Sequence, residues 1–166
     1  IFFHIRDVFL GAKQVQVRTE YILANPLSWL DLISEHKASS TWAPCFAYAL
    51  INDKLGNDKY NWDLSSMRLF LNGGEAVNAV AAQKFLTNLE RYGLSASAMH
   101  PTWGMSETSS GCIYSYDFIR DTDGGIHYIN NPAAFSRVKL EKSTSKCPSY
   151  VEIGKPIPGL YLAITD

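Results

Sequence analysis

The sequence predicts an α/β fold in which a mainly parallel sheet is flanked by helices and followed by a β-rich C-terminal part. Over roughly the first hundred residues, apolar runs of strand length alternate with stretches of helical periodicity. Glycines follow several of the helical stretches and mark their ends. We therefore divide the 166 residues into an α/β part over about 1–112 and a β-rich part over about 113–166.

The N-terminal part predicts helices and extended segments in turn. Apolar residues recur at helical spacing over 1–9, and alternation over 15–17 predicts a short strand. Asn25-Pro26 is typical of a helix cap followed by a first-turn proline, with apolar residues on one face as far as Ile33. An extended segment over 39–43 is expected to stop at Pro44.

The middle of the chain continues the alternation. The sequence predicts a helix over 46–51, a strand over 67–71, the longest amphipathic helix over 77–89 and a short strand over 96–99. Beyond these, Asp123-Gly124 between aromatic-rich runs predicts a hairpin, and the prolines and glycine before Leu160 predict a last strand over 160–164.

Composition and charge exclude several classes of protein. A net charge of −1 with scattered lysines and arginines gives no basic stripe for nucleic acid and no cluster for a membrane surface. Cys45, Cys112 and Cys147 form no CxxC pair and no zinc pattern with the four histidines, which favours a reducing, cytoplasmic setting. The first residue, Ile1, lies in an apolar segment, so we expect the sequence to be part of a larger protein.

Two strand ends carry residues of unusual chemistry, at the edge where α/β sheets bind ligands. In Asn72-Gly73-Gly74-Glu75, two glycines leave room for a flat ligand against bare backbone, although they also suit a tight strand-to-helix connection. In Thr102–Thr108 an aromatic can stack on a base, a hydroxyl can donate to phosphate and a carboxylate can hold a hard cation. A core tryptophan beside a helix cap formed by Ser106 or Thr108 would explain the second pattern equally well.

Other catalytic motifs are incomplete or absent. A nucleophile elbow needs Gly-x-Ser-x-Gly, whereas the segment from Gly104 ends in Thr108. No Rossmann fingerprint or Walker loop follows a predicted strand. The four histidines are scattered and indicate surface or core positions.

Together these stretches resemble the adenylate-forming superfamily, which includes acyl-CoA synthetases, fatty acyl-AMP ligases and the adenylation domains of nonribosomal peptide and polyketide assembly lines. Asn72-Gly73-Gly74-Glu75 looks like its glycine-rich adenine-contacting segment, and Trp103–Glu107 looks like its aromatic-Gly-x-Thr/Ser-Glu motif. Gly154–Gly159 resembles a later Gly-x-Pro-x-x-Gly strand entry, and Trp42–Tyr48 is similar to an Ala-Pro-Asn-Phe-Ala segment. The likeness covers nearly the whole chain.

Three positions depart from that pattern. Cys45 replaces the usual asparagine, Trp103 stands where tyrosine is commoner, and Ser106 stands where threonine is. The resemblance also implies a phosphate loop upstream of Ile1, and a ribose-binding aspartate, a hinge and a catalytic lysine downstream of Asp166. We therefore expect residues 1–166 to be one internal segment of an adenylation domain, inactive on its own.

The resemblance implies an ATP- and Mg²⁺-dependent ligase that converts a small carboxylic acid to an acyl-adenylate and passes the acyl group to a carrier-protein phosphopantetheine thiol. Its catalytic residues would be Ser106 and Glu107, with Glu107 as the metal ligand. The nucleotide would contact Gly73, Gly74, Glu75, Trp103, Gly104 and Ser106, and the acid would contact Asn72, Thr102, Ser110 and Gly111.

Three alternatives stay open on the sequence alone. Coenzyme A can replace the carrier protein as the thiol acceptor within the same superfamily. A non-catalytic α/β scaffold would show no affinity for nucleotide. A serine hydrolase using Ser106 would react with an active-site serine probe.

Overall fold

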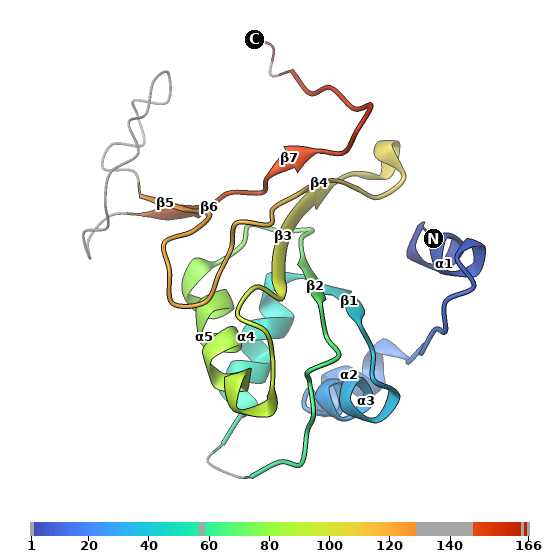
Figure 1. Cartoon of the computed structure of the whole chain (residues 1–166), viewed down its shortest axis with the longest axis vertical. Helices are drawn as coiled ribbons and strands as arrows, with labels where there is room; N and C mark the ends of the chain where they lie inside the picture. The colour runs from blue at the N-terminus through green and yellow to red at the C-terminus, as the bar shows by residue number, and fades with distance from the viewer. Residues whose placement is uncertain (1, 57–58, 129–147, 164, 166) are drawn as a thin grey trace.

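The architecture is taken from a computed structural model of the chain, which describes residues 2–56, 59–128, 148–163 and 165. Figure 1 shows a central sheet with helices packed against it. The sheet has five strands in the order β1-β2-β3-β4-β7. Their bounds are β1 Ser40–Ala43, β2 Leu69–Asn72, β3 Met99–Gly104, β4 Gly111–Tyr114 and β7 Lys155–Pro156.

The sheet is parallel at one side and antiparallel at the other. β1, β2 and β3 pair in parallel, while β4 and β7 add to them as antiparallel strands. A separate pair of antiparallel strands is formed by β5 Ile126–Tyr128 and β6 Ser149–Val151. The predicted α/β class is confirmed, as a mixed sheet flanked by helices.

The helices connect the parallel strands, because parallel neighbours need a crossover. Helix α4 (Cys45–Lys54) follows β1 and helix α5 (Ala79–Leu89) follows β2, and the two pack side by side (Figure 1). The α-helices are α1 Phe2–Phe9, α2 Thr19–Ala24, α3 Ser28–His36, α4 Cys45–Lys54 and α5 Ala79–Leu89, and the 3-10 turns are η1 Glu90–Tyr92 and η2 Ser106–Thr108. Within the described residues, no helix is long and apolar enough to span a membrane.

Helix α5 begins and ends as its sequence predicts. The side chain of Asn78 accepts a hydrogen bond from the backbone N–H of Ala81 at 3.0 Å and so caps the first turn. After α5 and η1, Gly93 takes a left-handed conformation with φ of 83°. Glycine adopts this conformation without steric cost, so the chain turns here towards β3.

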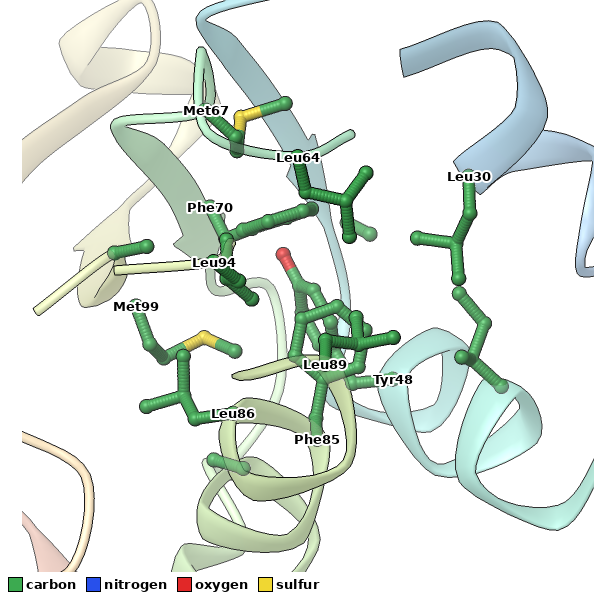
Figure 2. Packing of buried hydrophobic residues seen from close by; sticks show 14 of the residues in the cluster. Leu30, Tyr48, Leu64, Met67, Phe70, Phe85, Leu86, Leu89, Leu94 and Met99 are labelled. Atoms are coloured by element: carbon green, nitrogen blue, oxygen red, sulfur yellow. The ribbon is translucent and has the colours of Figure 1, made fainter. Parts of the chain in front are cut away.

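Aromatic side chains from three elements form the centre of the core (Figure 2). Tyr48 of α4, Phe70 of β2 and Phe85 of α5 are fully buried. The ring of Phe85 meets those of Tyr48 and Phe70 edge-on, with centroids 5.0 and 5.1 Å apart. Burial raises the pKa of Tyr48 well above its usual value, so its hydroxyl stays protonated and donates to the carbonyl of Leu71 at 2.9 Å.

Most of the elements predicted over the first hundred residues are present, with three differences. The segment 15–17 is not a strand: Val15 and Val17 are exposed, and none of the described strands pairs with them. Helix α2 was not predicted, and Asn25 ends α2 instead of capping α3. The strand predicted over 96–99 is β3, which begins only at Met99.

The hairpin predicted at Asp123-Gly124 is wrong. The run before this turn bonds to β3 and to the segment just before β3. The N–H of Ser115 donates to the carbonyl of Pro101 in β3, and the N–H of Arg120 donates to the carbonyl of Ala96. The run after it forms β5, whose partner is the distant β6. A local turn signal could not reveal this long-range pairing.

The strand predicted over 160–164 is also absent from 160–163, since the N–H of Leu160 bonds back to Ile157 in a turn and Tyr161 is 94% exposed. Ile164 lies outside the described residues, as does Cys147. Cys45 and Cys112 are buried free thiols.

Candidate nucleotide and acid site

The candidate site lies where β2 and β3 end. These strands are parallel neighbours, with Asn72 paired to Pro101, so the segments that follow them meet at one edge of the sheet. A pocket of about 350 Å³ opens there, within the size range of small-molecule sites. Its lining comprises Trp42, Leu71, Gly73, Gly74, Thr102, Trp103, Gly104, Met105, Ser106, Ser109, Ser110, Gly111 and Tyr114.

Two glycines of the pocket are required by close backbone contacts. A Cβ on Gly73 would lie 2.6 Å from the carbonyl oxygen of Thr102, and a Cβ on Gly104 would lie 2.1 Å from that of Ser110. Gly74 adopts φ of 88°, which side chains rarely tolerate. Gly73 and Gly74 therefore do form a tight connection after β2. Their backbone, which carries no side chain, also lines the pocket.

Two tryptophan side chains also line the pocket. Trp103 is 37% exposed at the end of β3, so it is not a core residue. Trp42 of β1 is 50% exposed, and its Cζ2 would lie 3.6 Å from a Cβ on Gly74. An exposed indole beside bare backbone is an arrangement that can hold a planar ring.

The turn η2 is shaped by Thr108 and leaves Ser106 free. The Thr108 hydroxyl accepts from the N–H of Met105 at 3.2 Å, and its single proton has the carbonyl oxygens of Met105 and Ser110 within reach as acceptors, each at 2.9 Å. The capping role considered for this segment thus falls to Thr108. Ser106 is exposed on the pocket and forms no side-chain hydrogen bond within the described residues, so its hydroxyl is available to a ligand.

The structure brings most of the predicted site residues together. Eight of them line the pocket: Gly73, Gly74, Thr102, Trp103, Gly104, Ser106, Ser110 and Gly111. Asn72, Glu75 and Glu107 do not line it.

Each of those three has a distinct environment. Asn72 is fully buried, and among the described residues its side-chain amide has no hydrogen-bond partner. Glu75 is exposed, and its Oε1 accepts from the N–H of Phe46 in the first turn of α4 at 2.7 Å. Glu107 is exposed on η2, next to Ser106. Within the described chain no group of three His, Cys, Asp or Glu could hold a metal ion.

Sequence reasoning missed some of the lining, chiefly Trp42, Leu71 and Tyr114. A usable signal existed for Leu71, because it alternates with the core residue Phe70 and so faces away from the helices. Tyr114 reaches the pocket only through the antiparallel pairing of β4 with β3, which no local pattern predicts.

Comparisons with known proteins agree on one family. The model of the AMP-binding enzyme family matches residues 7–166. Among curated proteins, the microperfuranone synthase of Emericella nidulans is 35% identical over 113 residues, which are 68% of this chain. The chain spans 12% of the length of that relative.

Solved structures show the same likeness. The adenylation domain of a keto acid-selecting NRPS module bound to keto acyl adenylate is 35% identical, with a TM-score of 0.89 over 96% of this chain and 29% of that one. The structure of McyG A-PCP complexed with phenylalanyl-adenylate is 33% identical, with a TM-score of 0.69 over 80% of this chain and 27% of that one.

Proposed function

Because the chain belongs to the AMP-binding enzyme family, we propose that it is the nucleotide- and acid-binding part of an enzyme that activates a carboxylic acid with ATP and transfers the acyl group to a carrier-protein phosphopantetheine thiol. The observation that carries the proposal is the pocket itself, which unites the two glycine- and aromatic-bearing motifs at adjacent strand ends. The family match covers both motifs.

The first half-reaction depends on positioning. A carboxylate oxygen attacks the α-phosphorus of ATP, the bond to the bridging oxygen breaks, and pyrophosphate leaves with the electron pair. Adenine lies between Trp103 and the bare backbone of Gly73-Gly74, and the free hydroxyl of Ser106 donates to an α-phosphate oxygen. Holding both reactants in one pocket removes much of the entropic cost of their meeting.

The residues present fit Mg²⁺ as an ATP-bound cofactor. Mg²⁺ is usually held by one or two carboxylates together with substrate phosphates and water, so a full protein cage is not needed. Glu107 supplies one such carboxylate, and it forms no hydrogen bond or ion pair within the described residues. When bound, the ion offsets negative charge on the phosphoryl oxygens.

A carrier protein is the acceptor that we propose for the second half-reaction. The likeness to McyG A-PCP, in which an adenylation domain is accompanied by a carrier, supports it. Coenzyme A is the alternative acceptor, and comparing acyl transfer to each thiol separates the two. The hydrolase alternative gains no support from the pocket, because none of the described residues that line it is a histidine that could act as a base.

The proposal is tested by acid-dependent exchange of pyrophosphate into ATP, measured on the longer enzyme that contains this segment. Exchange that requires both an acid and Mg²⁺ is expected. A protein that binds no nucleotide and supports no exchange would instead be a scaffold. The solved relatives carry a keto acyl adenylate in one case and phenylalanyl-adenylate in the other, so the likeness alone does not choose the acid.

A further inference from the structure

The loop over 105–110 connects β3 to β4 and carries two of the residues to which the proposed function gives a role (Figure 1). Ser106 and Glu107 lie in its turn η2, and both are exposed. Neither side chain forms a hydrogen bond or an ion pair within the described residues. The backbone of the loop therefore sets the direction in which each of them points.

Backbone contacts hold this loop at two points. The N–H of Thr108 donates to the carbonyl of Met105 at 3.1 Å. The N–H of Ser109 donates to the carbonyl of Ser106 at 3.0 Å. Ser109 itself adopts a left-handed conformation with φ of 66°, which is uncommon for a residue with a side chain. Such a conformation persists where the surrounding contacts impose it, so the loop needs a further constraint.

The hydroxyl of Thr108 supplies that constraint. It accepts from the N–H of Met105 at 3.2 Å, and its proton has the carbonyl oxygens of Met105 and Ser110 within reach, each at 2.9 Å. When the proton goes to Ser110, this one side chain joins the first residue of the loop to the last. A Cβ on Gly104 would lie 2.1 Å from the same Ser110 oxygen, so the far end of the loop packs directly on the end of β3.

From these contacts we infer that Thr108 is a positioning residue: its hydroxyl holds the loop in the shape that directs Ser106 towards the α-phosphate and Glu107 towards Mg²⁺. The inference rests on the proposed function. Thr108 does not itself line the pocket, so loss of its hydroxyl acts on the reaction through the two residues before it. A misplacement of about 1 Å can cost roughly a hundredfold in rate.

The first test separates the hydroxyl of Thr108 from its bulk. In the longer enzyme, Thr108→Val keeps the shape and Thr108→Ser keeps the hydroxyl. We expect kcat/KM for ATP in pyrophosphate exchange to fall by about ten- to a hundredfold in Thr108→Val and to stay near the wild-type value in Thr108→Ser. Thr108→Ala also lacks the hydroxyl, and it replaces the valine variant if that variant does not fold.

Thr122→Val is the matched control, because Thr122 forms a similar turn outside the pocket lining. Its hydroxyl accepts from the N–H of Gly124 at 3.1 Å and donates to the carbonyl of Ile119 at 3.0 Å. This variant is expected to leave kcat/KM unchanged. Normal exchange without the Thr108 hydroxyl, or an equal loss in Thr108→Ser, overturns the inference and leaves the proposed function standing. A wild-type enzyme that supports no exchange contradicts the proposed function, and the inference with it.

A double variant tests whether Thr108 acts through Glu107. Thr108→Val is expected to raise the Mg²⁺ concentration for half-maximal exchange by about threefold or more in the otherwise wild-type enzyme. In a Glu107→Gln background the same change is expected to raise it by less than about twofold, because effects that pass through one group are not additive. A loss of stability alone would not depend on Glu107 in this way. An equal increase in both backgrounds would overturn the inference, since Thr108 would then not direct Glu107 towards the ion.

Discussion

Trp103 and the Gly73-Gly74 backbone contribute one aromatic wall and one bare peptide wall to the same pocket. The aromatic wall can be removed without touching the core, because Trp103 is 37% exposed. The bare wall cannot be altered so freely, since a Cβ on Gly73 would collide with the backbone of Thr102. Trp103 is therefore the position at which the proposed stacking of adenine can be tested.

Trp103→Ala is expected to weaken nucleotide binding by roughly ten- to a hundredfold, because stacking a base on an aromatic is worth about 1–3 kcal/mol. Trp103→Phe keeps a ring and should recover most of the affinity. Calorimetric titration of the longer enzyme with AMP measures both. Unchanged affinity in a folded Trp103→Ala variant would exclude this placement of the base.

Glu107→Gln is expected to slow acid-dependent pyrophosphate exchange most strongly at limiting Mg²⁺, because the amide keeps the shape and loses the charge that Mg²⁺ prefers. The free energy of unfolding should change by less than about 1 kcal/mol, since the side chain is exposed and unpaired among the described residues. Glu20→Gln, an exposed change on α2, serves as the control. A normal Mg²⁺ dependence of the Glu107 variant would remove this residue from the metal site.

At the scale of elements, the glycine turn is held by two contacts from α4. The Tyr48 hydroxyl donates to the Leu71 carbonyl at the end of β2, and Glu75 accepts from the first turn of α4. The first contact is fully buried and the second is exposed, so Tyr48 is the stronger of the two anchors. The helix thereby fixes the strand end that forms the pocket wall.

Tyr48→Phe is expected to lower the free energy of unfolding by about 0.5–1.5 kcal/mol, because it removes one buried hydrogen bond and keeps the ring packing. Tyr116→Phe is the matched control, since Tyr116 is 68% exposed and its hydroxyl has no hydrogen-bond partner among the described residues. Urea denaturation of both variants gives the comparison. Equal losses would mean that the Tyr48 hydroxyl does not anchor the strand.

The elements differ in how far the sequence could predict them. β2, α5 and their glycine turn are encoded locally, by an apolar run, a helical period and a cap. The pairing of β5 with β6 is not, because it joins segments separated by more than twenty residues. The site follows the same division: Trp103 and the glycines were predictable from motifs, whereas Trp42 and Tyr114 reach the pocket only through sheet pairing.

At the scale of the whole molecule, the chain is short relative to the proteins that it resembles. The chain spans 12% of the curated relative and 29% of the solved adenylation domain that it resembles. The Trp42 and Trp103 side chains on the pocket are partly open to solvent. Electrostatic catalysis depends on excluding water, and the pocket formed by the described residues is open to it.

The 166 residues alone are therefore expected not to catalyse adenylation. The family resemblance implies that a phosphate loop, a ribose-binding aspartate and a catalytic lysine would lie outside 1–166, and deleting a single oxyanion donor in an enzyme already costs roughly a hundred- to a thousandfold in rate. Losing three such elements should reduce turnover to background while weak AMP affinity remains.

Pyrophosphate exchange with a panel of carboxylic acids compares this chain with one extended in both directions. Trp103→Ala in the short chain tests whether any residual AMP binding uses the pocket. Equal activity of the short and extended chains would contradict the expectation, because the pocket described here would then already contain every group that the reaction needs.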